Sequence, residues 1–356
     1  MTRVVCAMSG GVDSAVAAAA LRAQGYDVVG VTLQVWPTAR DDDRACCALS
    51  AVEEARRVAA KLGVPHYVLN CQEEFRRAVI DHFISEYRAG RTPNPCIQCN
   101  RWIKFDWLLQ RAAELGADCV ATGHYARTIY HADLGRWSVR RGVDRHKDQS
   151  YVLYGLTQAQ LPRVCFPLGG LTKPAVRDLA RAHGFRVHNK PESQEICFVP
   201  DDDYGQFLRQ ELPEIATPGP IVDTTGRRRG THPGVAFYTI GQRRGLGIAA
   251  PEPLYVVALD PARNTVVVGA EADLRRQRAA AEDLVFGKYA AAMLAEPVPV
   301  LASLRSTMSA QPALAHVEAG RLLVTFQEPQ RAVTPGQALV CYAGEDVAVG
   351  GTVIGP

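Results

Sequence analysis

The sequence predicts a mixed α/β protein with a parallel-sheet domain at the N-terminus, a small central β-rich domain and a C-terminal β-barrel. Strands alternate with helices over the first 200 residues, turn signals multiply after residue 200, and short strands dominate from about residue 280. A chain of 356 residues is expected to form two or three domains rather than one core. We therefore expect domains at residues 1–203, 204–277 and 278–356.

The N-terminal domain is predicted from strands and helices that follow one another at the spacing of βαβ units. Strands are expected at residues 4–8, 28–35, 64–70 and 119–122. Helices are expected from the loop at residues 9–14 through about residue 23, and at residues 51–62, 75–87 and 103–115. Because parallel strands need crossover connections, this order predicts a parallel sheet covered by helices on both faces.

The last two domains are predicted from β-branched segments separated by Pro-Gly, Asp-Thr-Thr-Gly and similar turns. A hairpin is expected at residues 254–259 and 265–269. Short strands follow at residues 298–304, 315–317, 322–326, 338–342 and 347–354. Short strands at this spacing are typical of a small barrel.

Composition narrows the class of protein. Apolar residues make up 47% of the chain, charged residues 22%, and the net charge is +3. No run reaches the roughly 18 apolar residues of a membrane span, and the N-terminus does not resemble an export signal. We expect a cytoplasmic protein with no membrane partner, in which the ten cysteines are reduced thiols.

The first candidate site is Ser-Gly-Gly-Val-Asp-Ser at residues 9–14, between a strand and a helix. Two glycines allow the backbone to approach a polyanion, and the helix N-terminus adds N–H donors. Asp13 in such a loop suggests a Mg²⁺ ion beside the phosphates. No lysine follows the glycines, so this is not a Walker A loop. The string resembles the pyrophosphate-loop ATPases, which implies a nucleotide-binding domain that adenylates a carbonyl oxygen.

The second candidate site combines Cys96 and Cys99, in a Pro-flanked loop at residues 92–100, with Cys197. A Cys-x-x-Cys pair can be half a zinc site, a redox pair or two unrelated thiols, and four-cysteine zinc would need a second pair. Beside an adenylating loop, two thiols are suited to sulfur transfer, in which one carries a persulfide and the other releases its sulfur.

With these motifs together, the chain resembles the tRNA-specific 2-thiouridylase family along nearly its whole length. The strings that carry the resemblance are at residues 9–14, 94–100, 121–125, 147–151, 193–198 and 238–247. The resemblance implies an ATP-dependent enzyme that replaces the C2 oxygen of the wobble uridine of tRNA with sulfur. It further implies tRNA and a sulfur-donor protein as partners.

The resemblance also implies residue roles. Cys99 matches the nucleophile and Cys197 the persulfide carrier, which form a transient disulfide. The implied ATP contacts are Ala7, Met8, Ser9, Gly10, Gly11, Val12, Asp13, Ser14, Leu33 and Gly123; the target-base contacts are Asn94, Pro95 and Cys96; the tRNA contacts are His124, Lys147, Asp148, Gln149, Arg305, Ser306 and Gln337.

Cys96 departs from the family pattern, in which an aspartate can stand at this position as an acid/base. One hypothesis is that Cys96, Cys99 and Cys197 together bind a [4Fe–4S] cluster that carries the sulfur. Two rival functions also remain open: an amide-forming ligase that does not use Cys197, and a non-catalytic tRNA-binding protein that releases no pyrophosphate.

Overall fold

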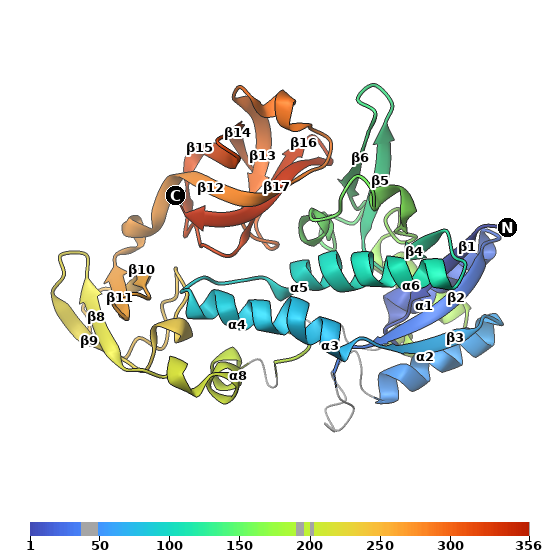
Figure 1. The fold of residues 1–356 in the computed structure, drawn as a ribbon, viewed down its shortest axis with the longest axis horizontal. Coiled ribbons are helices and arrows are strands. Elements are labelled where there is room, and N and C mark those ends of the chain that lie inside the picture. The colour runs from blue at the N-terminus through green and yellow to red at the C-terminus, as the bar shows by residue number, and fades with distance from the viewer. Residues whose placement is uncertain (37–48, 190–195, 200–202, 356) are drawn as a thin grey trace.

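Five parallel strands form the sheet of the N-terminal domain in the computed structural model, which describes residues 1–36, 49–189, 196–199 and 203–355 (Figure 1). The strand order is β3-β2-β1-β4-β7. Their bounds are β1 (Arg3–Ala7), β2 (Asp27–Gln34), β3 (His66–Asn70), β4 (Cys119–Ala121) and β7 (Val164–Cys165). All four pairings are parallel, so the predicted sheet is confirmed.

Helices cover both faces of the sheet. Alternate residues of β1 point to opposite faces, and the two sets pack against different helices. Val4 and Cys6 pack in one apolar cluster with α1 (Val12–Ala23), α2 (Leu49–Leu62) and α7 (Lys173–Ala182). Val5 packs in another cluster with Leu108 and Leu109 of α6 (Leu108–Glu114). All three β1 residues are fully buried, as expected for a central strand of a parallel sheet.

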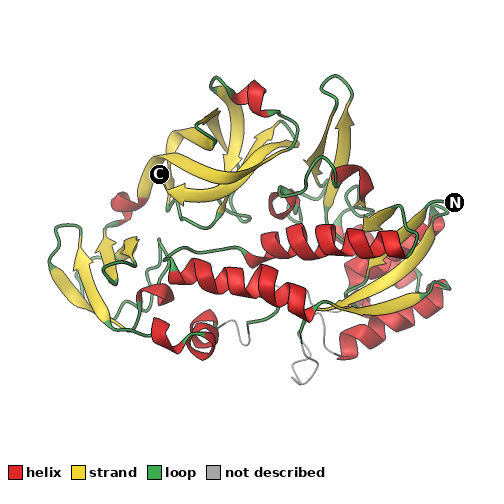
Figure 2. Cartoon of the chain, in the orientation of Figure 1, coloured by secondary structure: helices red, strands yellow, loops and turns green. Residues whose placement is uncertain are grey.

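Two long helices connect this sheet to the rest of the molecule (Figures 1 and 2). The first consists of α3 (Gln72–Phe75), a π-helical stretch (Arg76–Ile80) and α4 (Asp81–Arg88); the second consists of α5 (Pro95–Gln98), a π-helical stretch (Cys99–Trp107) and α6. No helix in the described ranges is long and apolar enough to cross a membrane.

The expectation that both cysteines of the pair lie in a loop was wrong. The helix begins at Pro95, because the Asn94 side chain accepts a hydrogen bond from the Cys96 N–H at 3.1 Å and caps the first turn. Proline is well tolerated at the first helical position, so the Pro-flanked string starts a helix instead of preventing one.

The central domain is β-rich, as predicted. Its four strands pair in the order β10-β11-β8-β9 and follow α8 (Tyr204–Glu211). Their bounds are β8 (Gly219–Asp223), β9 (Arg228–His232), β10 (Tyr255–Asp260) and β11 (Thr265–Gly269). Its core is shared with the first long helix, since Phe83 and Tyr87 lie in one apolar cluster with Phe237 and Val256.

Six antiparallel strands close into the predicted C-terminal barrel, because β12 pairs with both β15 and β17. The bounds are β12 (Arg275–Phe286), β13 (Val298–Ser303), β14 (Gln311–Glu318), β15 (Arg321–Arg331), β16 (Ala338–Ala343) and β17 (Asp346–Gly355). The boundary expected from the sequence between the central domain and the barrel, after residue 277, falls inside β12, because this strand begins at Arg275.

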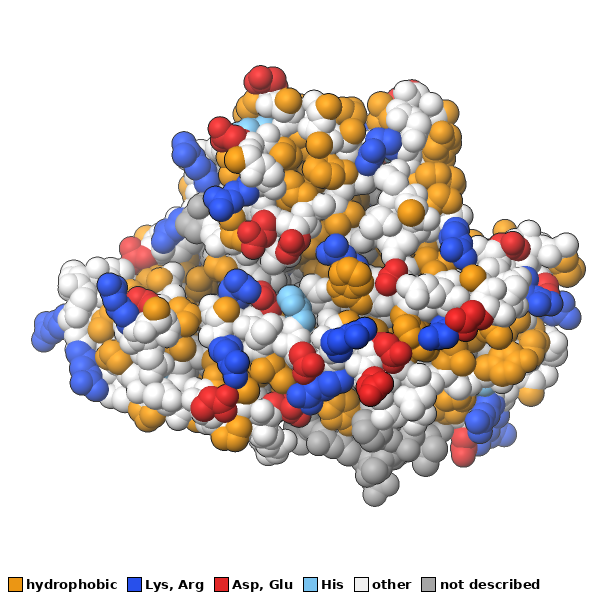
Figure 3. Space-filling view, viewed as in Figure 1, with side chains coloured by type: hydrophobic (Ala, Val, Ile, Leu, Met, Phe, Trp, Pro, Cys, Tyr) orange, Lys and Arg blue, Asp and Glu red, His pale blue; other side chains and the backbone are white. Residues whose placement is uncertain are grey.

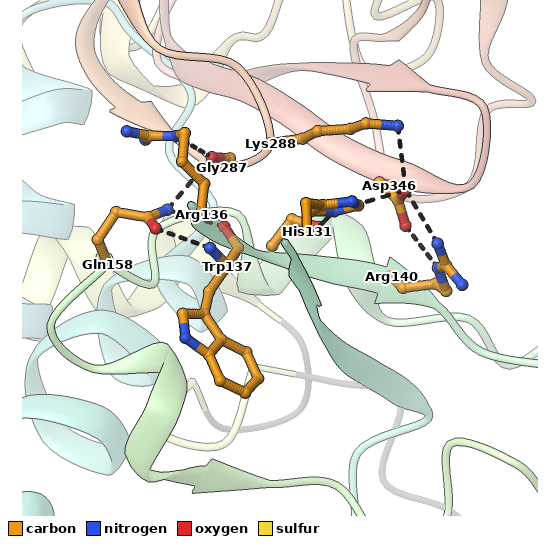
Figure 4. Close-up of polar contacts among 9 residues, drawn as sticks. His131, Arg136, Trp137, Arg140, Gln158, Gly287, Lys288 and Asp346 are labelled. Carbon is orange, nitrogen blue, oxygen red and sulfur yellow. Dashed lines mark hydrogen bonds and ion pairs between the residues drawn. The ribbon is translucent and has the colours of Figure 1, made fainter. Parts of the chain in front are cut away.

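A hairpin that the sequence did not reveal joins the N-terminal domain to the barrel. It consists of β5 (Ala126–His131) and β6 (Arg136–Arg141), and β6 pairs with β17. The buried Asp346 carboxylate accepts hydrogen bonds from Arg140 at 2.5 and 3.1 Å and lies 3.4 Å from Lys288 and 3.7 Å from His131 (Figure 4). Burial alone would raise the pKa of Asp346, but the bonds to Arg140 and the surrounding positive charge hold it below its ordinary value.

Replacing Asp346 with alanine should destabilise the junction between hairpin and barrel. The change leaves the Arg140 and Lys288 charges without their buried partner, and we expect a loss of about 2–3 kcal/mol, below the value for fully buried pairs. The free energy of unfolding from urea titration measures this loss. Asp178→Ala is the control, since its ion pair with Arg181 is exposed and its loss should cost under about 0.5 kcal/mol. Equal stability of the two variants would contradict the assigned role of Asp346.

Candidate active site

A cleft of about 370 Å³ opens at the carboxyl ends of β1, β2 and β4, the edge at which open parallel sheets bind ligands. Its volume lies within the roughly 300–1,000 Å³ of ordinary small-molecule sites. Segments distant in the sequence form its walls, among them the phosphate loop, the end of β2, the residues after β4, the start of the second long helix and the segment around Cys197.

The phosphate loop meets the cleft at the start of α1. The Ser9 N–H donates to the Ser14 hydroxyl at 3.1 Å, and that hydroxyl donates to the Gly11 carbonyl at 3.1 Å. Gly10 has a φ of +70°, and a Cβ there would lie 2.2 Å from the Ala51 carbonyl oxygen. Only glycine fits this position. The N-terminus of α1 carries no side-chain cap at Gly11, so its N–H groups suit an anion.

A lysine that the sequence reasoning missed completes the loop. Lys173, at the start of α7, donates to both carboxylate oxygens of Asp13 at 2.7 and 2.8 Å. The Tyr125 hydroxyl donates to the same carboxylate at 2.7 Å. Lys173 is itself buried. The structure therefore brings a positive charge to a loop that lacks a lysine of its own.

Cys96 and Cys99 lie on the first turns of the second long helix, and both line the cleft. Cys99 begins the π-helical stretch, a feature that often occurs at functional sites. Lys104 follows Cys99 by about one π-helical turn and also lines the cleft. It is the only lysine or arginine among the cleft-lining side chains that the structure describes. An α-helical pattern would not have brought Lys104 to the same side as Cys99, because only residues three or four apart are neighbours on an α-helix.

Cys197 is held at the cleft by the residue that follows it. Phe198 is buried, and its ring packs against Phe75, Phe83 and Phe207 with centroids 5.8, 5.3 and 5.4 Å apart. Cys197 is exposed and lines the cleft. The predicted motif at residues 193–195 lies outside the described residues.

The cysteines outside the cleft have a different environment. Cys6 and Cys341 are fully buried, and burial raises the pKa of each thiol to about 12. Cys119 is buried and Cys165 is half-buried, on neighbouring strands. A thiol with a strongly raised pKa is a poor nucleophile, so the environment of Cys6 and Cys341 suits packing and not catalysis.

His124 lies in the cleft wall in its neutral form. Its Nδ1 is 2.7 Å from the Thr122 hydroxyl, and burial, with a smaller effect of the Lys104 charge, holds the pKa of His124 well below 6.5. Because His124 is buried, a ligand can reach it only by entering the cleft.

The cleft gathers most of the predicted ATP and thiol residues. It is lined by Ala7, Met8, Ser9, Asp13, Ser14, Leu33 and Gly123, by Pro95, Cys96, Cys99 and Cys197, and by His124 and Gln149. The remaining predicted residues do not line it: Gly10, Gly11, Val12, Asn94, Lys147, Asp148, Arg305, Ser306 and Gln337.

Predicted tRNA contacts that lie outside the cleft make hydrogen bonds within the protein. Asp148 accepts from the Ser150 hydroxyl at 2.8 Å, and the Arg305 guanidinium donates to the carbonyls of Arg331 and Ala332 at 2.8 Å each. Gln337 donates to the Thr92 carbonyl at 2.8 Å. Each of these side chains has a structural partner in addition to any RNA contact.

The three cleft cysteines do not fit a metal site. Within the described ranges, no group of three or more His, Cys, Asp or Glu side chains is arranged to hold a metal ion. The geometry of the described residues therefore gives the iron–sulfur hypothesis no support.

The surface carries both signs of charge (Figure 3). Basic side chains gather at the β8–β9 end, where Arg227, Arg228 and Arg229 are exposed. Arg229 donates to Asp223 at 2.8 Å, and Arg228 donates to Thr231 at 2.9 Å. These arginines are partly engaged within their own turn.

Family profiles match all three domains. They are described as a tRNA methyl transferase HUP domain at residues 2–201, a tRNA methyl transferase PRC-barrel domain at residues 205–270 and an aminomethyltransferase β-barrel domain at residues 277–354. The first profile and the phosphate loop define the class: a nucleotide-binding HUP domain joined to two β domains.

Relatives that match over nearly the whole chain identify the family. The tRNA-specific 2-thiouridylase of Heliobacterium modesticaldum is 52% identical, with 99% of this chain and 92% of the relative covered. The enzyme of the same name from Carboxydothermus hydrogenoformans is 50% identical, with 99% and 97% covered. The chain belongs to the tRNA-specific 2-thiouridylase family. The profile descriptions name methyl transfer instead, but matches over the full length outweigh descriptions of single domains.

Solved structures show weaker likeness. A 4-thiouridine synthetase–RNA complex with bound ATP is 19% identical with a TM-score of 0.35, covering 60% of this chain and 51% of that one. An NMN synthetase from Francisella tularensis is 17% identical with a TM-score of 0.33, covering 60% and 77%. These scores support no functional argument.

Replacing Phe198 with alanine should release Cys197 from the cleft, because that ring anchors the segment in the aromatic cluster. We expect disulfide formation between Cys99 and Cys197 under a mild oxidant to slow at least about tenfold, since thiol–disulfide exchange requires close approach of the two sulfurs. Mass spectrometry of the cross-linked peptides measures the rate. Phe237→Ala removes a ring that packs against Arg209 in the same apolar cluster and serves as the control. A wild-type rate in Phe198→Ala would contradict the anchoring role.

Proposed function

We propose that this protein is a tRNA-uridine 2-sulfurtransferase, which uses ATP to replace the C2 oxygen of the wobble uridine of tRNA with sulfur. The observation that carries the proposal is one cleft lined by the phosphate loop, Cys99 and Cys197. Family membership supports the substrate, and the cleft supports the chemistry.

The proposed reaction begins with adenylation. ATP enters with Mg²⁺, its phosphates at the N-terminus of α1 and at Ser9 and Ser14. The uridine is extruded from the anticodon loop into the cleft, as enzymes acting on a base require. Its C2 oxygen attacks the α-phosphate and pyrophosphate leaves, so that the oxygen becomes the leaving group AMP.

Sulfur transfer follows at the same carbon. The terminal sulfur of a persulfide on Cys197 attacks C2. The Cys99 thiolate then attacks the Sγ of Cys197, and the sulfur–sulfur bond of the persulfide breaks. The sulfur that stays on C2 takes that electron pair, expels AMP and becomes the thiocarbonyl. A Cys99–Cys197 disulfide remains, and a thiol reductant restores the pair.

The exposure of Cys197 suits delivery by a sulfur-donor protein. A donor persulfide must reach the thiol that receives its sulfur, whereas the resolving thiol needs only to meet the carrier. Cys99 is half-buried on its helix, which fits the second role.

Two lysines supply positive charge that the phosphate loop lacks. Lys173 neutralises Asp13, which would otherwise repel the triphosphate. Lys104 stands beside Cys99 in the cleft wall, where charge develops as pyrophosphate leaves and sulfur attacks. His124 is neutral and can exchange hydrogen bonds with the base without adding charge.

Cys99→Ser and Cys197→Ser should each abolish thiolation while ATP binding survives. The phosphate loop lies on α1 and is untouched by either change. The assay incubates protein with unmodified tRNA, ATP, Mg²⁺ and a small-molecule persulfide, which transfers its outer sulfur to Cys197 without a change in oxidation state, and then measures 2-thiouridine by mass spectrometry and pyrophosphate release. Cys341→Ser is the control, since this thiol is buried in the barrel.

The same assay separates the rival functions. Thiolation retained in either cleft variant would overturn the cysteine roles. An amide ligase would depend on ammonia or an amine and would tolerate the loss of Cys197. A tRNA-binding protein without activity would bind tRNA in a salt-dependent way but release no pyrophosphate.

Lys104→Met should lower the single-turnover thiolation rate roughly 100- to 1,000-fold, the range found when one preorganised electrostatic donor is removed. Lys104→Arg should recover part of this loss, because it restores the positive charge. Arg111→Met on the same long helix is the control, since its partner is the exposed Glu114. A wild-type rate in Lys104→Met would remove this residue from the mechanism.

A further inference from the structure

Thr92 connects all three domains just before the helix that carries Cys96 and Cys99. Its N–H donates to the carbonyl of Pro335 in the barrel at 2.8 Å, and its carbonyl accepts from the Gln337 side chain at 2.8 Å. Its hydroxyl donates to the hydroxyl of Thr239 in the central domain at 3.2 Å. The backbone polar groups of one residue are thus both bonded by the barrel.

The barrel segment that touches Thr92, residues 333–337, is fixed within its own domain. The Gly336 N–H donates to the Val353 carbonyl at 2.9 Å, and the Val353 N–H donates to the Gln337 carbonyl at 2.7 Å. Upstream, Arg305 bonds the carbonyls of Arg331 and Ala332. We call residues 333–337 the barrel loop.

The contact between the barrel loop and Thr92 leaves no spare room. Gly336 has a φ of +89°, and a Cβ there would lie 2.8 Å from the Thr92 nitrogen and 3.0 Å from both the Thr92 carbonyl carbon and the Arg91 Cβ. Any side chain at this position would push the backbone of Thr92 away from the barrel. The two segments are fitted backbone to backbone.

The other end of the Thr92 segment is fixed to the first long helix. The Arg91 guanidinium donates to both oxygens of the buried Glu86 carboxylate, and the Arg91 N–H donates to the Glu86 carbonyl at 2.9 Å. After Thr92, Asn94 caps the helix that presents Cys96 and Cys99. A displacement of Thr92 must therefore appear at that cap.

We propose that the barrel loop is a positioning element of the active site: through Thr92 it sets where the Asn94-capped turn and Cys99 lie relative to the phosphate loop. This inference rests on the proposed function. Gln337 and Gly336 are then positioning residues that act through Thr92, and seating of the barrel is a condition for catalysis. A misplacement of about 1 Å at reacting groups can cost roughly 100-fold in rate, so a small change at this contact has a large effect.

The test compares Gly336→Ala with Gly320→Ala. Gly320 lies in the exposed β14–β15 turn with a φ of +76° and no atom near its added Cβ, so it reproduces the backbone strain without the collision. We expect Gly336→Ala to lower the single-turnover thiolation rate about 30- to 100-fold. The dissociation constants for ATP and tRNA should stay within about twofold of wild type, and Gly320→Ala should react like wild type.

Gln337→Leu is the second variant, because it removes the bond to the Thr92 carbonyl without adding bulk. We expect a rate loss of about tenfold with unchanged tRNA affinity, as for the loss of one hydrogen bond. A fall in tRNA affinity that accounts for the whole rate loss would mean that this side chain serves RNA binding, and it would overturn the positioning role. Equal rates in Gly336→Ala and Gly320→Ala would overturn it as well.

A readout without activity separates this inference from the proposed function. Disulfide formation between Cys99 and Cys197 under a mild oxidant should slow in Gly336→Ala and not in Gly320→Ala. If the wild-type protein fails to thiolate tRNA yet this rate responds, the proposed function fails and the positioning role stands. If the wild-type protein thiolates tRNA and neither rate responds, the positioning role fails alone.

Discussion

The carboxyl edge of the parallel sheet is the constraint on which the active site depends. β1, β2 and β4 all end there, so the loop after β1, the end of β2 and the residues after β4 share one opening. The N-terminus of α1 faces the same opening and carries no side-chain cap. Every parallel sheet has such an edge. In this protein the anion site and the thiols of the cleft lie along it.

The second constraint is the start of the long helix at Pro95. The Asn94 cap and Pro95 fix where the first turn begins; that turn carries Cys96, and Cys99 follows it directly. A thiol on a capped helix has far less freedom than a thiol on a loop. The π-helical stretch from Cys99 onward then places Lys104 on the same wall. The position of Cys99 and the positive charge on the same cleft wall are therefore set by the same few residues.

The domains are joined by polar contacts as well as by apolar cores. The hairpin meets the barrel around Asp346, with Arg136 also donating to the carbonyls of Gly287 and Phe286 at 2.9 Å each (Figure 4). The barrel meets the segment that leads into the second long helix at Thr92. These two junctions lie near opposite ends of the barrel strand β17, so the barrel is held against the N-terminal domain at two separate places.

The sequence by itself determined the order of the three domains, the sheet, the barrel, the position of the phosphate loop and the identity of the candidate thiols. Each of these features can be recognised from a short local pattern of residues. Sequence reasoning missed the hairpin at residues 126–141 and placed two cysteines in a loop, since Pro-flanked strings fit both a loop and a helix start. Only the tertiary structure decided that Lys173, 160 residues from Asp13, completes the phosphate loop, and that Phe198 anchors Cys197. No local pattern encodes such contacts, because they arise only when sheet, helices and barrel have packed and brought distant segments together.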